Sequence, residues 1–234
     1  MAEGAPAGLP HLDAATLAPM IDPAKTALVI VDIQNDFAGP SGLLKRVGVD
    51  MALAEAAIDR IEAIIPAARQ AGATLAFMRV VTEPETDSDA LKALYARKGR
   101  PGGQGICRTE DGGADYYRVS PEPGDIEIAK LLYDSFHGTD LEDQLRARGI
   151  DTLVMTGVAT DCCVDATTRS GFHRGFHVFV VSDACASYEE ELHLGTLKVL
   201  HKNCALLTTS DALVAAWSGA GAGTDTDSVQ GAPQ

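Results

Sequence analysis

Three residues with the chemistry of a nucleophilic catalytic centre each lie at or just beyond the end of a short apolar, β-prone run. They are Asp32, Lys130 and Cys163. A cysteine thiolate attacks a carbonyl carbon, and a carboxylate takes and returns the proton. A neighbouring ammonium group favours both anions. The three residue types therefore predict a cysteine-dependent hydrolytic centre.

The segment around Cys163 has the pattern of a strand followed at once by a helix. Gly157 is expected to turn the chain, and Thr160 to act as the N-cap of the helix. Cys163 would then lie in the first helical turn, where the helix dipole lowers the pKa of a thiol. The backbone N–H groups from Ala159 to Cys163 are expected to form an oxyanion hole. The adjacent Cys162 is interpreted as a bystander.

Strand and helix patterns alternate six times along the chain. Expected strands cover residues 26–31, 73–79, 125–129, 152–156, 176–181 and 204–208. Expected helices cover about 50–70, 88–98, 139–148, 160 to near 171–175, 189–201 and 210–217. This alternation is typical of an α/β fold, a Rossmann-like three-layer sandwich with a six-stranded, mainly parallel sheet and helices on both faces. Right-handed crossovers place the carboxyl ends of the strands at one edge, where ligands bind.

The chain is expected to form one domain over residues 24–217. Residues 1–23 are interpreted as an arm that lies over the domain or over a neighbouring subunit, and residues 218–234 as a disordered tail. Residues 82–120 are charged and rich in glycine, and they are too long for an ordinary connection. They are predicted to be an insert that acts as a lid or a binding loop.

Composition excludes several classes of protein. Apolar residues make up 46% of the chain, and 19 Lys plus Arg face 33 Asp plus Glu, for a formal net charge of −14. Such an acidic chain is a poor partner for nucleic acid or an anionic membrane surface. The sequence shows neither an apolar stretch of the roughly 18 residues that span a bilayer nor a secretory signal. Five cysteines without framework spacing indicate free thiols in a cytoplasmic protein.

Three segments resemble the signatures of the isochorismatase-like cysteine hydrolase superfamily. They are Val29-Ile-Val-Asp-Ile-Gln-Asn-Asp-Phe37, Lys130 followed by Tyr133-Asp-Ser-Phe-His-Gly-Thr-Asp-Leu141, and Gly157-Val-Ala-Thr-Asp-Cys-Cys-Val164. The resemblance covers roughly residues 25–215 and implies the isochorismatase-like hydrolase fold. It implies that Asp32 is the general base, Lys130 the catalytic lysine and Cys163 the nucleophile. It also implies a cis Val158–Ala159 peptide, with the Ala159 and Cys163 amides shaping the oxyanion hole.

Departures from particular branches of the superfamily narrow the chemistry. True isochorismatases cleave a vinyl ether and lack the nucleophilic cysteine, so Cys163 favours hydrolysis of a C–N bond. Nicotinamidases bind a metal through histidines after the second strand, and none of the six His here lies between residues 12 and 136. No metal and no cofactor are therefore expected. The histidines at 173, 177, 193 and 201 are interpreted as surface or packing residues.

The expected activity is hydrolysis of a small amide, carbamoyl or ureido compound through a thioester intermediate. The alternatives are an aryl-amide or lactam hydrolase of the same superfamily, or a catalytically silent binding or scaffold protein. Phe37 and Asn35, in the loop after Asp32, and Tyr133 are expected to bind substrate. Loop arginines are candidate partners for a substrate carboxylate. These are Arg79, Arg97, Arg100, Arg108 and Arg118. The superfamily also implies a homo-oligomer, either a dimer or a tetramer.

Overall fold

The sheet contains all six predicted strands, and every neighbouring pair is parallel. The computed structural model of the chain describes residues 8–220. The strands are β1 (Thr26–Val31), β2 (Thr74–Val80), β3 (Ile126–Lys130), β4 (Thr152–Val158), β5 (His177–Ala186) and β6 (Leu206–Thr208). Their order in the sheet is β3-β2-β1-β4-β5-β6. The predicted α/β fold with a six-stranded parallel sheet is confirmed.

Helices cover both faces of this sheet. They are α1 (Ala14–Leu17), α2 (Asn35–Ala38), α3 (Leu43–Arg46), α4 (Ala52–Ala71), α5 (Asp89–Arg97), α6 (Leu141–Ala147), α7 (Asp165–His173), α8 (Glu190–Asn203) and α9 (Ser210–Ala220). Two 3₁₀ turns (Ala18–Met20 and Pro23–Lys25) and one turn of π-helix (η3, Thr160–Val164) complete the structure. No helix within residues 8–220 has the length and hydropathy of a transmembrane span.

Side chains alternate between two cores because successive residues of a strand point to opposite faces. In β1, Leu28 and Ile30 pack in one core with residues of α4 and α9. Ala27 and Val29 pack in the other core with residues of α6 and α8. All six residues of β1 are buried, as expected for a central strand of a parallel sheet.

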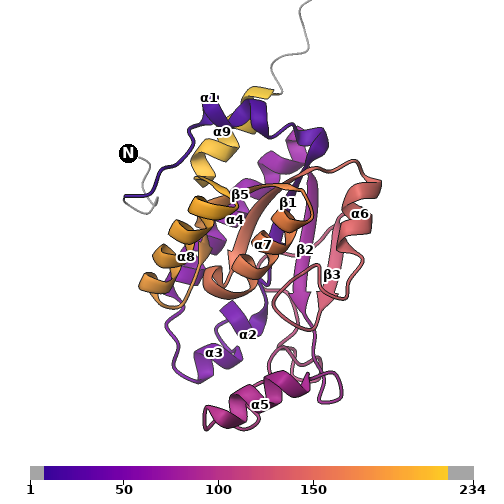
Figure 1. The fold of residues 1–234 in the computed structure, drawn as a ribbon, viewed down its shortest axis with the longest axis vertical. Helices are drawn as coiled ribbons and strands as arrows, with labels where there is room; N and C mark the ends of the chain where they lie inside the picture. Colours follow the sequence, from indigo (N-terminus) through magenta and orange to yellow (C-terminus); the bar gives the residue numbers. More distant parts are fainter. Residues whose placement is uncertain (1–7, 221–234) are drawn as a thin grey trace, which may run out of the picture.

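The order of the strands reverses beside β1, which lies between β2 and β4. The connection from β1 goes to β2 on one side, and the chain later returns to β4 on the other. Ligands of open parallel sheets bind at the carboxyl edge near such a switch point. Figure 1 shows α5 at one end of the molecule and α1 with α9 at the opposite end. Asp32 and Lys130 lie at the carboxyl edge, after β1 and at the end of β3.

Gly157 lies inside β4 and does not turn the chain out of the strand, so the predicted turn is wrong. Its φ is +114°, and an added Cβ would lie 2.1 Å from the Val31 carbonyl oxygen. The register between β4 and β5 shifts between Met155 and Gly157. Only glycine fits this close approach of two strand backbones at positive φ. The sequence pattern could not distinguish this use of glycine from a turn.

The amino-terminal segment packs on its own domain within the described residues. The Leu12 amide donates to the Leu207 carbonyl at 2.8 Å, and the Thr208 hydroxyl donates to the Leu12 carbonyl at 3.1 Å. Leu17 is fully buried in the core that contains α9. At the other end, α9 continues to Ala220, three residues beyond the predicted helix end. The rest of the predicted tail, and residues 1–7 of the predicted arm, lie outside the described residues.

Candidate active site

Asp32 and Lys130 form a buried ion pair at the carboxyl edge of the sheet. The Lys130 Nζ donates to the Asp32 Oδ2 at 2.7 Å and to the Leu132 carbonyl at 3.0 Å. The Lys130 side chain is 0% exposed and that of Asp32 is 1% exposed. The other carboxylate oxygen, Asp32 Oδ1, is buried and has no hydrogen-bond partner within residues 8–220. The carboxylate therefore keeps one oxygen free to accept a proton.

The backbone directs the Asp32 side chain at the end of β1. Asp32 has a φ of +56°, a conformation that aspartate tolerates better than most residues. Its amide donates to the Met78 carbonyl on β2, and its carbonyl accepts from the Gln34 amide. Hydrogen bonds of the Asp32 amide and of the Asp32 carbonyl therefore fix the turn that ends β1.

Cys163 lies in the π-helical turn η3, between β4 and α7. Thr160 does not act as the predicted N-cap. The residue at that position is Ala159, which makes no side-chain capping bond. The Thr160 hydroxyl instead pairs with Nδ1 of His193 on α8, at 2.8 Å. This contact joins the turn that carries Cys163 to the neighbouring helix.

The pKa of the Cys163 thiol is raised, which contradicts the expectation from a helix start. Its contact with Cys162 is the largest cause, followed by burial and by the Asp32 carboxylate, while Lys130 acts in the opposite direction. Burial lowers the pKa of Lys130, but Asp32 and Cys163 outweigh burial and raise it above its ordinary value. The resting centre thus holds a neutral thiol beside a charged ammonium group. Cys162 contributes to this balance and also lines the neighbouring cavity.

The Ala159 and Cys163 amides, predicted to form the oxyanion hole, lie at the junction of β4 and η3. The Val158–Ala159 peptide is cis, as the resemblance implied. The Ala159 carbonyl accepts from the amides of Cys162 at 3.0 Å and Val164 at 3.2 Å. Cys163, between these two donors, is not among the donors to that carbonyl. Both Ala159 and Cys163 line the cavity beside the ion pair.

A cavity of about 280 Å³ opens above Cys163, and we call it the catalytic cavity. Its wall is largely apolar and aromatic. The wall includes Phe37, Leu91, Ile106, Leu131, Tyr188 and Leu192. Tyr133, predicted to bind substrate, also lines it, and burial raises the pKa of its phenol to about 12. The Tyr188 hydroxyl donates to the Phe37 carbonyl at 2.8 Å, which fixes the loop that carries Phe37.

Asn35 does not line the catalytic cavity, in contrast to the prediction. Its side-chain amide donates to the Gly112 carbonyl at 2.9 Å, and its backbone amide donates to the Asp115 carbonyl at 2.9 Å. Both bonds join the loop after β1 to the insert at residues 82–120. The geometry gives Asn35 a role in positioning this loop.

Gln34 and Asp36, which were not singled out in the sequence, also bind the insert, and Gln34 binds the end of β2 as well. Gln34 is fully buried. Its Nε2 donates to the carbonyls of Val80 at 2.7 Å and Ala114 at 2.8 Å, and its Oε1 accepts from the Val80 amide at 2.7 Å. The Asp36 Oδ2 accepts from the Cys107 amide at 2.7 Å. In the sequence, the only sign of these contacts was a run of polar residues directly after a buried strand.

The insert forms one wall of the catalytic cavity through α5 and the residues after it. Ser88 caps α5, since its hydroxyl accepts from the Leu91 amide at 3.1 Å. Arg108 binds Asp87 with two hydrogen bonds, of 2.9 and 2.6 Å. Of the other candidate arginines, Arg118 pairs with Glu55, Asp59 and Glu62, and Arg79 with Glu127. Arg97 and Arg100 are exposed and do not line the cavity.

Within residues 8–220, no group of three His, Cys, Asp or Glu side chains gathers as a metal site requires. His193 bonds Thr160, and burial is the largest cause of its lowered pKa. His11 bonds the Ser182 hydroxyl at 2.8 Å. These two histidines therefore have structural partners.

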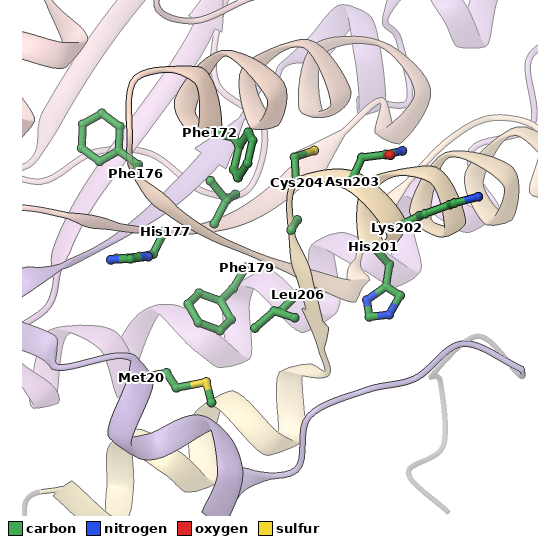
Figure 2. A pocket seen from close by; sticks show the side chains of 12 residues that line it. Met20, Phe172, Phe176, His177, Phe179, His201, Lys202, Asn203, Cys204 and Leu206 are labelled. Atoms are coloured by element: carbon green, nitrogen blue, oxygen red, sulfur yellow. The ribbon is translucent and has the colours of Figure 1, made fainter.

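A second and larger hollow, of about 570 Å³, lies at the amino ends of β5 and β6, away from Cys163. We call it the amino-end groove. Figure 2 shows it bordered by Phe179 and Leu206 of the sheet and by Met20 of the amino-terminal segment. It is lined by His177, His201 and Cys204, among others. Cys204 lies near the partly exposed pair of Arg169 and Asp165, whereas the pair of Asp32 and Lys130 beside Cys163 is buried.

Comparisons with known proteins agree with this geometry. The isochorismatase domain model matches residues 26–212. The ureidoacrylate amidohydrolase RutB of Methylobacterium radiotolerans is 38% identical over 193 residues, which are 76% of this chain and 73% of that protein. A homologue of the same name from Variovorax paradoxus is 34% identical, over 76% of this chain and 79% of its own.

Solved structures agree with the fold. A cysteine hydrolase from Pseudomonas syringae pv. phaseolicola superposes with a TM-score of 0.75 at 25% identity, covering 86% of this chain and 95% of its own. The N-carbamoylsarcosine amidase of Thermoplasma acidophilum gives a TM-score of 0.63 at 26% identity, covering 80% of this chain and 97% of its own. With the domain match, the sequence relatives and the shared fold in agreement, the chain belongs to the isochorismatase family of hydrolases.

Proposed function

We propose that this protein is a cysteine-dependent amidohydrolase that cleaves a small amide, carbamoyl or ureido compound through a thioester. Hydrolysis of a carbon–nitrogen bond is the activity of the amidohydrolases to which it is similar. The observation that carries the proposed mechanism is the buried pair of Asp32 and Lys130 beside Cys163. One oxygen of Asp32 is held by Lys130, and the other is unpartnered. This is the arrangement of a base that has one oxygen available for proton transfer.

The first half of the reaction forms the thioester. Asp32 takes the Cys163 proton as the sulfur bonds to the carbonyl carbon, because the raised pKa keeps the resting thiol neutral. The carbonyl oxygen gains negative charge and accepts hydrogen bonds from the Ala159 and Cys163 amides. When the tetrahedral intermediate collapses, the C–N bond breaks. Asp32 returns its proton to the departing nitrogen.

The second half hydrolyses the thioester. Asp32 takes a proton from water as the water oxygen bonds to the thioester carbonyl. The C–S bond then breaks, and the proton on Asp32 returns to the sulfur. Lys130 keeps its proton throughout because its pKa is raised. Its charge stabilises the negative charge of the Asp32 carboxylate and of the Cys163 sulfur.

The test is ammonia release from a panel of amides, carbamoyl compounds and ureides, combined with intact mass of the protein after rapid acid quench. We expect a covalent acyl adduct on Cys163 in the wild-type chain and none in Cys163→Ala. Lys130→Met and Asp32→Asn should also lose turnover. Turnover by Cys163→Ala at the wild-type rate would contradict the thioester mechanism. Absence of turnover of every compound in the panel would contradict the proposed substrate classes.

A further inference from the structure

The wall of the catalytic cavity has no cation that could receive a substrate carboxylate. None of the described residues that line it is Lys, Arg or His. Residues 1–7 and 221–234 contain no Lys, Arg or His in the sequence either, so no basic side chain comes from there. The charged side chains that do line the cavity are Asp161 and Glu189.

Two buried or largely buried cations close to the catalytic cavity are already paired. The Lys130 ammonium group binds Asp32 and the Leu132 carbonyl, and its side chain is 0% exposed. Arg108, in the insert, binds both oxygens of Asp87, and its side chain is 13% exposed. Among the described residues that line the cavity, a substrate carboxylate would thus meet two acidic side chains and no cation. Burial of an unpaired charge is unfavourable.

One polar atom of the wall lacks a partner. Gln104 lines the catalytic cavity, and its Oε1 is buried without a hydrogen-bond donor within residues 8–220. Its Nε2 donates to the Asp87 Oδ2 at 3.3 Å. Because a carboxylate only accepts, this contact fixes the amide with its NH₂ group on Asp87 and leaves Oε1 as an acceptor. Because this oxygen is buried, an N–H group of a substrate reaches it only when the Gln104 side chain turns toward the cavity.

We infer that the substrate is an uncharged amide or ureide with an apolar substituent, and that Gln104 accepts a hydrogen bond from one of its N–H groups. The inference rests on the proposed function and specifies the substrate of that same cavity. Apolar side chains such as Leu91, Ile106 and Leu192 contact the substituent, while Cys163 faces the carbonyl. A ureide that carries a carboxylate is therefore a poor substrate. In this respect the cavity differs from one built to bind an anion.

The charge preference is tested with a matched pair, 3-ureidopropanoate and its methyl ester, which share the same ureide group. We expect kcat/KM for ammonia release to be at least about 10-fold higher for the ester. Binding of both compounds to Cys163→Ala, by calorimetry, should give the same order. Equal or better turnover or binding of the acid would overturn the inference and leave the proposed function intact. Absence of both turnover and binding for the two compounds would contradict the ureide assignment itself.

Two exposed aliphatic positions on α8 provide a matched pair of variants. Leu192 lines the cavity and is 44% exposed, whereas Val199 is 45% exposed and does not line it. Leu192→Arg should raise the acid-to-ester ratio of kcat/KM by about 10-fold, since it supplies the missing cation. Val199→Arg should leave the ratio unchanged. An unchanged ratio in both variants, with both chains folded, would argue against a charge filter in the cavity.

The role of Gln104 is tested with substrates methylated on one or the other ureide nitrogen of the ester. In the wild-type chain, the isomer that lacks the donated N–H should lose about 10-fold in kcat/KM. In Gln104→Met, which keeps the size but removes the acceptor, that loss should disappear. The same loss in both proteins would overturn the role of Gln104, whatever the charge preference.

Discussion

Of the two hollows, the catalytic cavity is the smaller, yet it has a better arrangement of residues for catalysis than the amino-end groove. The groove, at about 570 Å³, is the larger, and it contains a cysteine and two histidines. The catalytic cavity has about 280 Å³, but its cysteine lies beside a buried ion pair at the carboxyl edge of the sheet. The charged neighbours of Cys204, Arg169 and Asp165, form an ion pair that is partly exposed. The position of a thiol relative to strand ends, and not the volume around it, therefore indicates the chemistry.

The sharpest test of this difference removes each thiol in turn. Cys163→Ala should lower kcat/KM by at least about 10³-fold, because it removes the nucleophile. Cys204→Ala should change kcat/KM by less than about 2-fold, within the range of a substitution remote from the reacting atoms. Steady-state ammonia release measures both. The distinction between the two regions fails if the Cys204 variant loses as much activity as the Cys163 variant.

A pair of glycines tests how tightly the backbone is packed at each end of the sheet. At Gly157, an added Cβ would overlap the Val31 backbone, and we expect Gly157→Ala to cost more than about 4 kcal/mol. Gly175, just before the groove, has a φ of +82° and nothing within 4 Å of an added Cβ. Gly175→Ala should cost only about 1–2 kcal/mol, from the left-handed conformation alone. Urea unfolding measures both free energies, and soluble yield replaces it where a variant does not fold. Equal costs at the two glycines would contradict the prediction.

The buried ion pair should matter for stability as well as for turnover. Lys130→Met leaves Asp32 charged and unpaired, which should cost about 3–5 kcal/mol of unfolding free energy. The double variant Lys130→Met with Asp32→Asn should recover most of that stability but no activity. Lys202→Met, at an exposed position in the groove, serves as the control and should lie within about 0.5 kcal/mol of the wild type. A double variant as unstable as Lys130→Met would contradict the electrostatic explanation.

The smallest effect is a dependence of stability on pH. Burial raises the pKa of Cys185, so the folded chain keeps a proton that the unfolded chain releases near the ordinary value of 9.0. Stability is therefore fully present below this pH and falls as pH rises above it, approaching about 1.4 kcal/mol per pH unit for a fully buried thiol. Cys185→Ala should flatten this slope in urea unfolding between pH 8 and about 10. Cys204→Ala, at a half-buried position, should flatten it less.

Much of the fold was predictable because apolar periodicity depends on local sequence. The six strands and the parallel sheet followed from alternation alone, and the positions of Asp32 and Lys130 at strand ends followed from the crossover rule. The use of Gly157 did not follow, since its need for glycine comes from Val31 on another strand. A contact between segments more than a hundred residues apart leaves no local pattern.

In the candidate site too, features that depend on local sequence were predictable, and features that depend on distant segments were not. Cys163 was correctly placed near the carboxyl edge, but its pKa depends on Cys162, burial and Asp32, which together outweigh any effect of a helix start. The pattern of a loop after Asp32 was visible, yet its polar side chains bind an insert that lies 70 or more residues later, as Asn35 does with Gly112. These distant partners decide which side chains of the loop face the cavity and which face the insert.

The loop after β1 recognises the insert through main-chain atoms. Gln34 binds the Ala114 carbonyl, and the Asp36 carboxylate binds the Cys107 amide. Gln34 also binds the Val80 amide and carbonyl at the end of β2. Such contacts are compatible with many side chains at the positions that they hold. The insert can therefore exchange cavity-lining residues such as Leu91 and Gln104 while its attachment to the catalytic loop is retained. Substrate preference and catalytic machinery are thus separable by mutation, and the cavity wall is a natural place to redesign selectivity.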